Sequence, residues 1–388
     1  MSNIPSGCIL YVGYDPNHAL LRRRRLSGIR RFAKAHGWEV ATLCPEEATP
    51  EAVRDAIERF HAAGCVVECW MARHDLPPRL FGSVPVVFFN PPERRAWRGV
   101  PSVVCDEAAV ARSAFDELSA GLPPCHAVAV QNPTRHAPWA RERIAAFRDC
   151  CRKAGKPCHV FPERNGEDES LRLARLKRWA AALPVHCAIF AVNDSTAETV
   201  ALALRSAGRP IPRSATLVGA DVAEVPEDGR PVSAISSVRI DYEVSGYLAA
   251  KTLAARCDGS TVASSYGPLF VERRDSTRGR GRREPWVLEA VDMIRHEACD
   301  GLSAEALARR FPVSRNLFER RFREAIGHSV LDEIIHVRMQ RVFDLLARPD
   351  FPIGAIADFS GFGCGYGLRK LFRLRTGMSL REWRKTRR

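Results

Sequence analysis

Residues 188–221 read AIFAVNDSTAETVALALRSAGRPIPRSATLVGAD, and this stretch indicates the fold of the larger part of the chain. Two short apolar runs, Ala188–Val192 and Ala215–Ala220, have the length and composition of buried strands. Between them, Thr196–Gly208 has the apolar spacing of an amphipathic helix. A strand, a helix and a second strand in this order are typical of a βαβ unit with parallel strands.

The same alternation of apolar runs and helical patterns continues toward the N-terminus. Further strands are predicted at Cys8–Tyr14, Ala63–Trp70, Val84–Asn90, His126–Gln131 and Cys158–Phe161. Helices are predicted at Leu20–Gly37, Glu51–Ala63, Glu107–Ala120, Trp139–Gly155 and Leu171–Ala182. Continuous apolar strands separated by amphipathic helices indicate an α/β fold with parallel sheets that are covered on both faces.

Ligands of such sheets bind outside the carboxyl ends of the strands. The loops that follow the predicted strands therefore contain the candidate ligand contacts, at Asp15–His18, Asn90–Arg94, Asn193–Asp194 and Asp221. A run of four arginines, Arg22–Arg25, lies on the first predicted helix. Four successive residues point in different directions around a helix, so we interpret this run as a solvated face and not as a nucleic-acid site.

Three later segments resemble the effector-binding domain of LacI-type repressors and of periplasmic sugar-binding proteins. They are the quoted stretch, AISSVRIDYEVSGYLAAKTL at Ala234–Leu253 and PLFVERRDSTR at Pro268–Arg278. HALLRRRRLSGIRRFAKAHGWEV, at His18–Val40, resembles the narrower group of xylose-operon regulators. The resemblance implies a periplasmic-binding-protein-like domain joined to a C-terminal DNA-binding domain of the AraC/XylS type.

The resemblance also implies which residues bind a sugar. In LacI-type domains these are the Asn of an AND-like motif, the Asp of a GxD motif and the Arg of an RxxGF motif. The matching residues are Asn193, Asp221 and Arg143, the last in a segment that has Ala146 where Gly is usual. Carboxylate, amide and guanidinium groups together suit vicinal hydroxyls, because they accept and donate hydrogen bonds in defined directions.

Other roles and other candidates stay open at this site. Asn193–Asp194 could serve only as the N-cap of the helix that contains Thr196. The first loop offers weaker candidates for ligand contact, and one of them, His18, could equally be a solvated surface residue. These first-loop candidates are Asp15, Asn17 and His18.

Arg273–Pro285, RRDSTRGRGRREP, is rich in Arg and Gly and reads as a linker between domains. It divides the chain into a sugar-sensing domain at residues 1–272, a linker at 273–285 and a DNA-binding domain at 286–388. The last of these is predicted to be all α, with two helix-turn-helix units.

The evidence for two units is an internal repeat. RRFREAIGHSV at Arg320–Val330 aligns with KLFRLRTGMSL at Lys370–Leu380 at a spacing of 50 residues. The surrounding sequence resembles the AraC/XylS signature, and helix-turn-helix motifs place their second helix in the major groove of DNA. The predicted helices are Trp286–Ala298, Ser303–Phe311, Arg315–Ala325, Ser329–Leu346, Ile353–Ser360, Tyr366–Thr376 and Ser379–Lys385.

Each predicted recognition helix has an apolar face and a polar face, because its polar residues recur at helical spacing. Arg, Asn and Glu can read the edges of base pairs, whereas an ordinary solvated face is the alternative. Glycines at 363, 365 and 367 are expected to loosen the second helix. The candidate DNA contacts are Arg315, Asn316, Glu319, Arg320 and Arg323 in the first unit, and Tyr366, Arg369, Lys370 and Arg373 in the second.

The charge distribution is compatible with this interpretation. The chain of 388 residues has a net charge of +14, and residues 303–388 alone hold 18 Lys and Arg against 9 Asp and Glu. A basic domain suits a polyanion, although a solubilising surface is the alternative. The 13 cysteines show no disulfide or zinc spacing, and no signal peptide or membrane-spanning run is found, so we expect a cytoplasmic protein.

Together these features predict a sequence-specific transcription regulator under the control of a small-molecule effector, with a pentose such as D-xylose implied by the resemblance. The expected partners are a double-stranded DNA operator, the sugar and a second copy of the chain in a homodimer, with RNA polymerase as a further candidate. No enzymatic activity, cofactor or metal is expected. Two alternatives remain: a DNA alkyl-transfer repair protein that uses Cys125 in Pro-Cys-His, and a regulator whose pocket no longer binds sugar.

Overall fold

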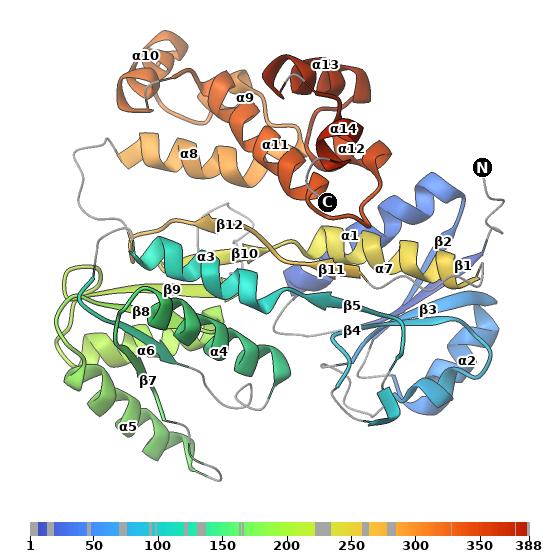
Figure 1. The fold of residues 1–388 in the computed structure, drawn as a ribbon, viewed down its shortest axis with the longest axis horizontal. Coiled ribbons are helices and arrows are strands. Elements are labelled where there is room, and N and C mark those ends of the chain that lie inside the picture. Colours follow the sequence, from blue (N-terminus) through green and yellow to red (C-terminus); the bar gives the residue numbers. More distant parts are fainter. Residues whose placement is uncertain are drawn as a thin grey trace. The chain divides into compact units, whose positions relative to one another are not determined.

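A computed structural model describes most of the chain, which forms two compact units, one within residues 1–279 and one within residues 280–388 (Figure 1). The described residues are 7–13, 19–44, 48–69, 76–92, 95–97, 99–119, 123–129, 137–162, 164, 167–221, 234–257, 264–277, 285–326, 328–376 and 378–385.

The first unit has two lobes, and each lobe is built on one sheet. All described pairs in the sheet of the first lobe are parallel, in the order β11-β5-β4-β3-β1-β2. Its strands are β1 (Cys8–Val12), β2 (Glu39–Leu43), β3 (Ala62–Glu68), β4 (Val86–Phe89), β5 (Ser102–Cys105) and β11 (Ser264–Tyr266).

The second lobe has a sheet of the order β12-β10-β9-β8-β6-β7, in which only the pair β10–β12 is antiparallel among the described strands. The strands are β6 (His126–Ala129), β7 (Cys158–Val160), β8 (Cys187–Ala191), β9 (Ala215–Asp221), β10 (Ser236–Ile240) and β12 (Pro268–Glu272). Two parallel sheets with helices between the strands confirm the predicted α/β class.

The helices of this unit follow the predicted pattern, with α7 in addition. They are α1 (Ala19–His36), α2 (Pro50–Arg59), α3 (Glu107–Ser119), α4 (Pro138–Lys153), α5 (Glu169–Ala182), α6 (Asp194–Ser206) and α7 (Tyr242–Cys257), with short 3-10 turns η2 (Pro78–Phe81) and η3 (Arg95–Trp97). Helices α1 and α7 pack against each other in the first lobe. None of the helices within the described ranges is long and apolar enough to cross a membrane.

The chain passes between the lobes three times, and the three crossings lie side by side. They are Cys105–Glu107, Ile240–Tyr242 and Tyr266–Pro268. The backbone N–H of Asp106 donates to the carbonyl of Tyr266 at 2.7 Å, and that of Asp241 donates to the carbonyl of Gly267 at 3.0 Å. These hydrogen bonds hold the crossings together at the carboxyl ends of β5, β10 and β11, where a ligand of parallel strands is expected.

The predicted linker is shorter than expected at its start. Arg274 is buried and its Nε donates to Glu272 at 2.9 Å, while the backbone N–H of Ser276 donates to Ala234. Residues 273–277 therefore belong to the first unit, because buried charges and backbone groups there find partners in β12 and its neighbours. The second unit begins with a helix at Pro285.

The second unit contains only helices among its described residues. They are α8 (Pro285–Glu297), η5 (Ala298–Asp300), α9 (Ala304–Ala308), α10 (Arg315–Ile326), α11 (Val330–Leu346), η6 (Ile353–Ala355), α12 (Ile356–Phe359), α13 (Gly365–Thr376) and α14 (Leu380–Lys385). Ser303 caps α9 by accepting from the backbone N–H of Ala306 at 3.1 Å. Helix α13 begins at Gly365, so Gly363, with a φ of +65°, precedes the helix and only two glycines remain in its first turn.

Candidate effector site and nucleic-acid interface

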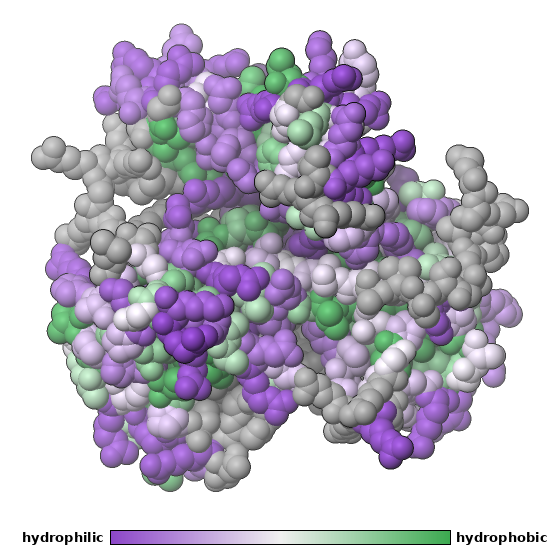
Figure 2. Space-filling model, viewed as in Figure 1, coloured by the Kyte–Doolittle hydropathy of each residue, from purple (hydrophilic) through white to green (hydrophobic). Residues whose placement is uncertain are grey.

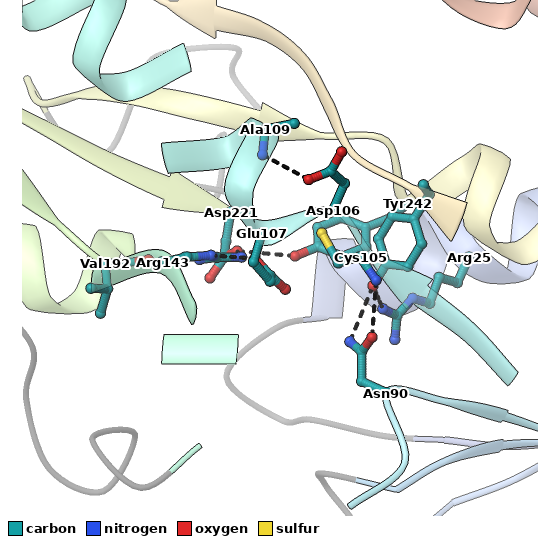
Figure 3. Close-up of polar contacts among 11 residues, drawn as sticks. Arg25, Asn90, Cys105, Asp106, Glu107, Ala109, Arg143, Val192, Asp221 and Tyr242 are labelled. Carbon is teal, nitrogen blue, oxygen red and sulfur yellow. Dashed lines mark hydrogen bonds and ion pairs between the residues drawn. The ribbon is translucent and has the colours of Figure 1, made fainter. Parts of the chain in front are cut away.

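Asp221 ends β9 and lies at the centre of a buried polar cluster (Figure 3). Its Oδ1 accepts from Arg143 Nη2 at 3.0 Å and from the phenol of Tyr242 at 3.1 Å. The backbone φ of Asp221 is +102°, a conformation that non-glycine residues rarely adopt. Strained residues of this kind concentrate at functional sites, so the conformation supports the choice of Asp221 as a site residue.

Arg143, on α4, is 3% exposed and satisfies its hydrogen-bond donors within the protein. Its Nε lies 2.5 Å from Glu107 Oε2, and its Nη1 donates to the carbonyl of Val192 at 2.6 Å. Burial alone lowers the pKa of the Arg143 guanidinium, but the carboxylates of Asp221 and Glu107 raise this pKa well above its usual value. The cation is therefore kept charged between two carboxylates, one of which is Asp221.

Asn193 is the N-cap of α6, as the alternative interpretation proposed. Its Oδ1 accepts from the backbone N–H of Thr196 at 2.9 Å and from the Thr196 hydroxyl at 2.6 Å. The adjacent Asp194 points instead toward β9, where Gly219 has no side chain to obstruct it. Asp194 Oδ2 is buried without a hydrogen bond among the described residues, and burial raises the pKa of this carboxyl to about 7.

A second buried cluster surrounds Arg25, which the sequence pattern placed on a solvated face. That interpretation is wrong for Arg25, which is 3% exposed because its helix turns it into the first lobe. Arg25 Nη1 forms an ion pair with Glu68 on β3, and Nη2 donates to the phenol of Tyr266 at 2.7 Å. The guanidinium also lies 4.1 Å from the ring centre of Phe89.

The two clusters meet at the crossings between the lobes. The rings of Tyr242 and Tyr266 are 6.1 Å apart, and Tyr242 contacts Asp221 whereas Tyr266 contacts Arg25. Asn90, in one of the predicted ligand loops, donates to Tyr266 at 3.3 Å. Figure 3 shows Arg25 and Asn90 of the first lobe on one side of Tyr242, and Asp221 of the second lobe on the other.

The structure thus brings together part of the predicted set. Asp221 and Arg143 are in direct contact, and Asn193 follows Val192, whose carbonyl binds Arg143. Several other members of the cluster belong to no motif, and their only sequence signal is their position at or near the end of a strand. These are Glu68, Glu107, Tyr242 and Tyr266. The candidates Asp15, Asn17 and His18 lie outside the described residues.

Carboxylate, guanidinium, amide and phenol groups at one place can bind a ligand that is rich in hydroxyls. Within the described ranges, no three His, Cys, Asp or Glu side chains are arranged to hold a metal ion. Cys125, the candidate nucleophile of the repair alternative, is 1% exposed in the core of the second lobe. A nucleophile needs access to its substrate, so this position does not favour alkyl transfer.

In the second unit, α10 separates its residues as predicted. Phe318 and Phe322 are buried in a core with Phe311, from the turn before α10, and Trp286 of α8 packs against this core. The polar side chains face the other way and line a shallow hollow, and hydrophilic residues gather over this end of the second unit in Figure 2. The lining residues are Asn316, Glu319, Arg320, Arg323 and Glu324, while Arg315 is exposed at the start of the helix.

Helix α13 has the same division of faces. Leu368 and Phe372 are buried, and Phe372 packs with Phe343 and Trp383. The four candidate contacts of this helix are all exposed, and Tyr366 has 71% of its surface accessible. They are Tyr366, Arg369, Lys370 and Arg373.

Two domain families match the two units. Residues 124–277 match the model of a periplasmic binding protein-like domain, and residues 307–386 match that of a helix-turn-helix domain. This pairing defines a class of transcription regulators in which an effector domain of the sugar-binding type is joined to a DNA-binding domain. The chain thus combines a periplasmic binding protein-like domain with a helix-turn-helix domain of the AraC type, which is the domain composition that the sequence resemblance implied, and it is similar to regulators of this class.

Known relatives of this kind are regulators and not enzymes. The chain is 26% identical over 290 residues to the xylose operon regulatory protein of Haemophilus influenzae, and this match covers 73% of this chain and 74% of that protein. It is 28% identical over 229 residues to the protein of the same name from Escherichia coli K12, and this match spans 58% of either chain.

Solved structures show the same fold. The xylose-binding transcription activator xylR superposes with a TM-score of 0.57 at 22% identity, covering 98% of both chains. The transcriptional regulator CelR in complex with cellobiose superposes with a TM-score of 0.53 at 20% identity, covering 69% of this chain and 84% of that one.

Proposed function

We propose that the protein is a transcription regulator whose effector is a sugar, most simply a pentose such as D-xylose, bound beside Asp221. The observation that carries this proposal is the contact of Asp221 with Arg143 and Tyr242 at the crossings between the lobes. Relatives with the same domain composition are named as xylose operon regulators, which favours a pentose over other sugars.

Sugar hydroxyls would bind by replacing hydrogen bonds that the site residues make with one another in the absence of a ligand. Arg143 and Tyr242 both donate to Asp221, so a hydroxyl that donates to this carboxylate and accepts from the guanidinium would fit between them. The amide of Asn193 would contribute through its nitrogen, since its oxygen caps α6. Asp15, Asn17 and His18 stay predictions as further ligand contacts.

The position of this cluster supports a role in signalling. Glu107 and Tyr242 lie on two of the three crossings, so a ligand that changes their contacts acts directly on the segments that join the lobes. We infer that sugar binding closes the lobes and thereby changes how the DNA-binding domains are presented to an operator.

The DNA-binding part of the proposal concerns a double-stranded operator read by α10 and α13. Two helix-turn-helix units in one subunit would occupy adjacent major-groove segments, which are roughly 34 Å apart on one face of DNA. We expect the protein to bind repeated half-sites as a homodimer, in which each subunit supplies one DNA-binding domain. Contact with RNA polymerase is a further part of the proposal.

A thermal-shift screen of the full-length protein against pentoses, hexoses and their phosphates tests the effector. A sugar at about 100 times its dissociation constant should stabilise its domain by about 2.7 kcal/mol. The shift should disappear in Asp221→Ala and persist in Asp149→Ala, because Asp149 lies on the outside of α4 and pairs with Arg152 and Lys153 of the same helix. A screen without any shift would favour a regulator that has lost its sugar pocket.

A further inference from the structure

The two recognition helices correspond residue by residue. Helices α10 and α13 each have 12 residues, and their starting residues, Arg315 and Gly365, are 50 apart. The buried positions agree at this spacing, since Phe318 and Phe322 match Leu368 and Phe372. The outward positions of one helix can therefore be compared directly with those of the other.

The helices that follow have matching caps, which supports this register. Ser329 accepts from the backbone N–H of Asp332 at 3.1 Å at the start of α11. Ser379, 50 residues later, accepts from the backbone N–H of Glu382 at 3.2 Å at the start of α14. The two units therefore share one local geometry, and differences between their exposed residues are differences in chemistry.

The outward faces have opposite charges at one position. At the central outward position Glu319 of α10 corresponds to Arg369 of α13. Two other pairs keep a positive charge, since Arg320 and Arg323 correspond to Lys370 and Arg373. The other outward differences are that Arg315 corresponds to Gly365, Asn316 to Tyr366 and Glu324 to Leu374.

Glu319 is the informative residue of this comparison. It lines the hollow together with Asn316, Arg320 and Arg323, and no hydrogen bond or ion pair of its side chain is found among the described residues. The other carboxylate of the hollow, Glu324, lies 3.9 Å from Arg320 and 3.8 Å from Arg321. An unpaired carboxylate repels the phosphates of DNA, so Glu319 opposes non-specific binding.

A hydrogen bond from a base to the Glu319 carboxylate can compensate for that repulsion. A phosphate cannot, because it has no hydrogen to donate. In the major groove, the N4 amino group of cytosine donates a hydrogen bond that Glu can accept. Glu319 lies in the first half of α10, which is the part of a recognition helix that reaches base edges. Glu324, near the end of the helix, lies where contacts with bases are not expected.

Helix α13 has cations on its outward face but contains no Asp or Glu. Its outward cations have no carboxylate beside them on the helix, and the Nη1 of Arg369 lies 3.1 Å from the position that a Cβ on Gly365 would occupy. The absence of a side chain at Gly365 therefore leaves room for the guanidinium over the first turn. Three cations on one exposed face attract phosphates at any sequence.

We propose that the two units divide the work of DNA binding. The first unit discriminates between sequences, with Glu319 accepting from the N4 amino group of a cytosine, and the second unit supplies salt-dependent affinity for the DNA backbone. This inference rests on the proposed function, because it presupposes that the protein binds an operator.

The test begins with duplexes selected by the full-length protein from a randomised pool. The selected consensus should contain one well-defined segment, with weaker preferences in the adjacent segment about one helical turn away. Exchange of the cytosine read by Glu319 should weaken binding about tenfold or more in the wild type, and this discrimination should be lost in Glu319→Gln. The matched control Glu324→Gln changes the net charge equally and should keep the discrimination.

Salt dependence tests the role of the second unit. Lys370→Ala should weaken binding of all duplexes by a similar factor and reduce the slope of log affinity against log salt by about 1. Failure of the wild type to select any duplex would contradict the proposed function itself. Selection of two equally defined segments, or unchanged base preferences in Glu319→Gln, would overturn the division between the units while leaving DNA binding intact.

Discussion

Arg25 carries a buried positive charge whose partners come from several parts of the first lobe. Glu68 neutralises it, and Tyr266 and Ser245 accept hydrogen bonds from it. The same carboxylate also accepts from the phenol of Tyr11 at 2.7 Å. Burial of such a pair is tolerated only when both charges stay compensated, so the pair is sensitive to the loss of one partner.

Replacement of Arg25 by Ala should therefore destabilise the first unit by about 3–5 kcal/mol, because it leaves the carboxylate of Glu68 buried without its cation. Urea unfolding of the two proteins measures this difference. Arg23→Ala is the matched control, since Arg23 is exposed on the same helix and should change stability by less than about 0.5 kcal/mol. Equal effects of the two substitutions would show that Arg25 is not a buried structural cation.

Asp194 provides a pH-dependent contribution to the same unit. Burial raises the pKa of its carboxyl to about 7, although the nearby Ser237 side chain and the charges of Arg239 and Arg274 oppose this shift. The nearby Asp221 carboxylate adds to it. A folded-state pKa above the unfolded value of about 3.9 means that the folded state holds the proton more tightly.

The stability contributed by protonated Asp194 is thus present below about pH 4 and is lost as the pH rises through about 7. In Asp194→Asn this loss should disappear, so that the variant gains stability relative to the wild type between pH 5 and pH 8. Unfolding midpoints of both proteins across this range measure the effect. Parallel curves for the two proteins would mean that another group determines the pH dependence.

The sequence could predict the site only where a local motif marked it. Asp221 and Arg143 were found through short motifs, and the structure places them in contact. Glu107 and Arg25 follow no such motif, because their roles arise from partners 36 and 43 residues away. A run of four arginines indicates a charged surface, and only the packing of α1 against its neighbours determines which of the four is buried.

At the scale of elements, helices α1 and α7 approach each other closely through two glycines. A Cβ added at Gly28 would lie 1.9 Å from the carbonyl oxygen of Glu243, and one added at Gly246 would lie 1.9 Å from that of Arg25. Backbone atoms cannot move aside as a flexible side chain can. Since α7 follows a crossing between the lobes, this contact holds the start of α7 and thereby Tyr242 in place.

Gly28→Ala should therefore separate the two helices and destabilise the first unit by roughly 1–3 kcal/mol, the usual range for overpacking. Thermal unfolding checks this, with Lys34→Ala on the exposed side of α1 as the control. Sugar binding, if measured in the same variant, should also weaken, because Tyr242 would lose its position beside Asp221. An unchanged melting temperature for Gly28→Ala would rule out the close packing of α1 on α7.

Elements with strong local patterns were predictable, and elements defined by their partners were not. The alternation of apolar strands and amphipathic helices indicated β1, β3, β4, β6, β7, β8 and β9. The three-residue strand β11 was missed because it is short and joins the sheet of the first lobe from position 264, after the chain has formed five strands of the second sheet. The start of the predicted linker is folded for a similar reason, since the backbone N–H of Arg274 donates to the hydroxyl of Ser236, 38 residues away.

At the scale of the whole molecule, the protein joins an effector domain to a DNA-binding domain, and the two functions are linked by thermodynamics. If the sugar changes the affinity for the operator by some factor, the operator must change the affinity for the sugar by the same factor. This relation holds whatever the arrangement of the two units, and it requires only that one protein binds both ligands.

We predict that the operator duplex changes the affinity for the sugar by the same factor as the sugar changes the affinity for the operator. Titration calorimetry measures the sugar affinity with and without the selected duplex, and the operator affinity is measured with and without saturating sugar. Factors of roughly 5 to 150 are typical of such coupling. Asp221→Ala should abolish both changes together while the affinity of the sugar-free protein for DNA is kept, because Asp221 lies at the effector site and α10 and α13 are unaltered. A sugar that binds at Asp221 with no effect on DNA affinity, and DNA that leaves sugar affinity unchanged, would show that the two domains act independently.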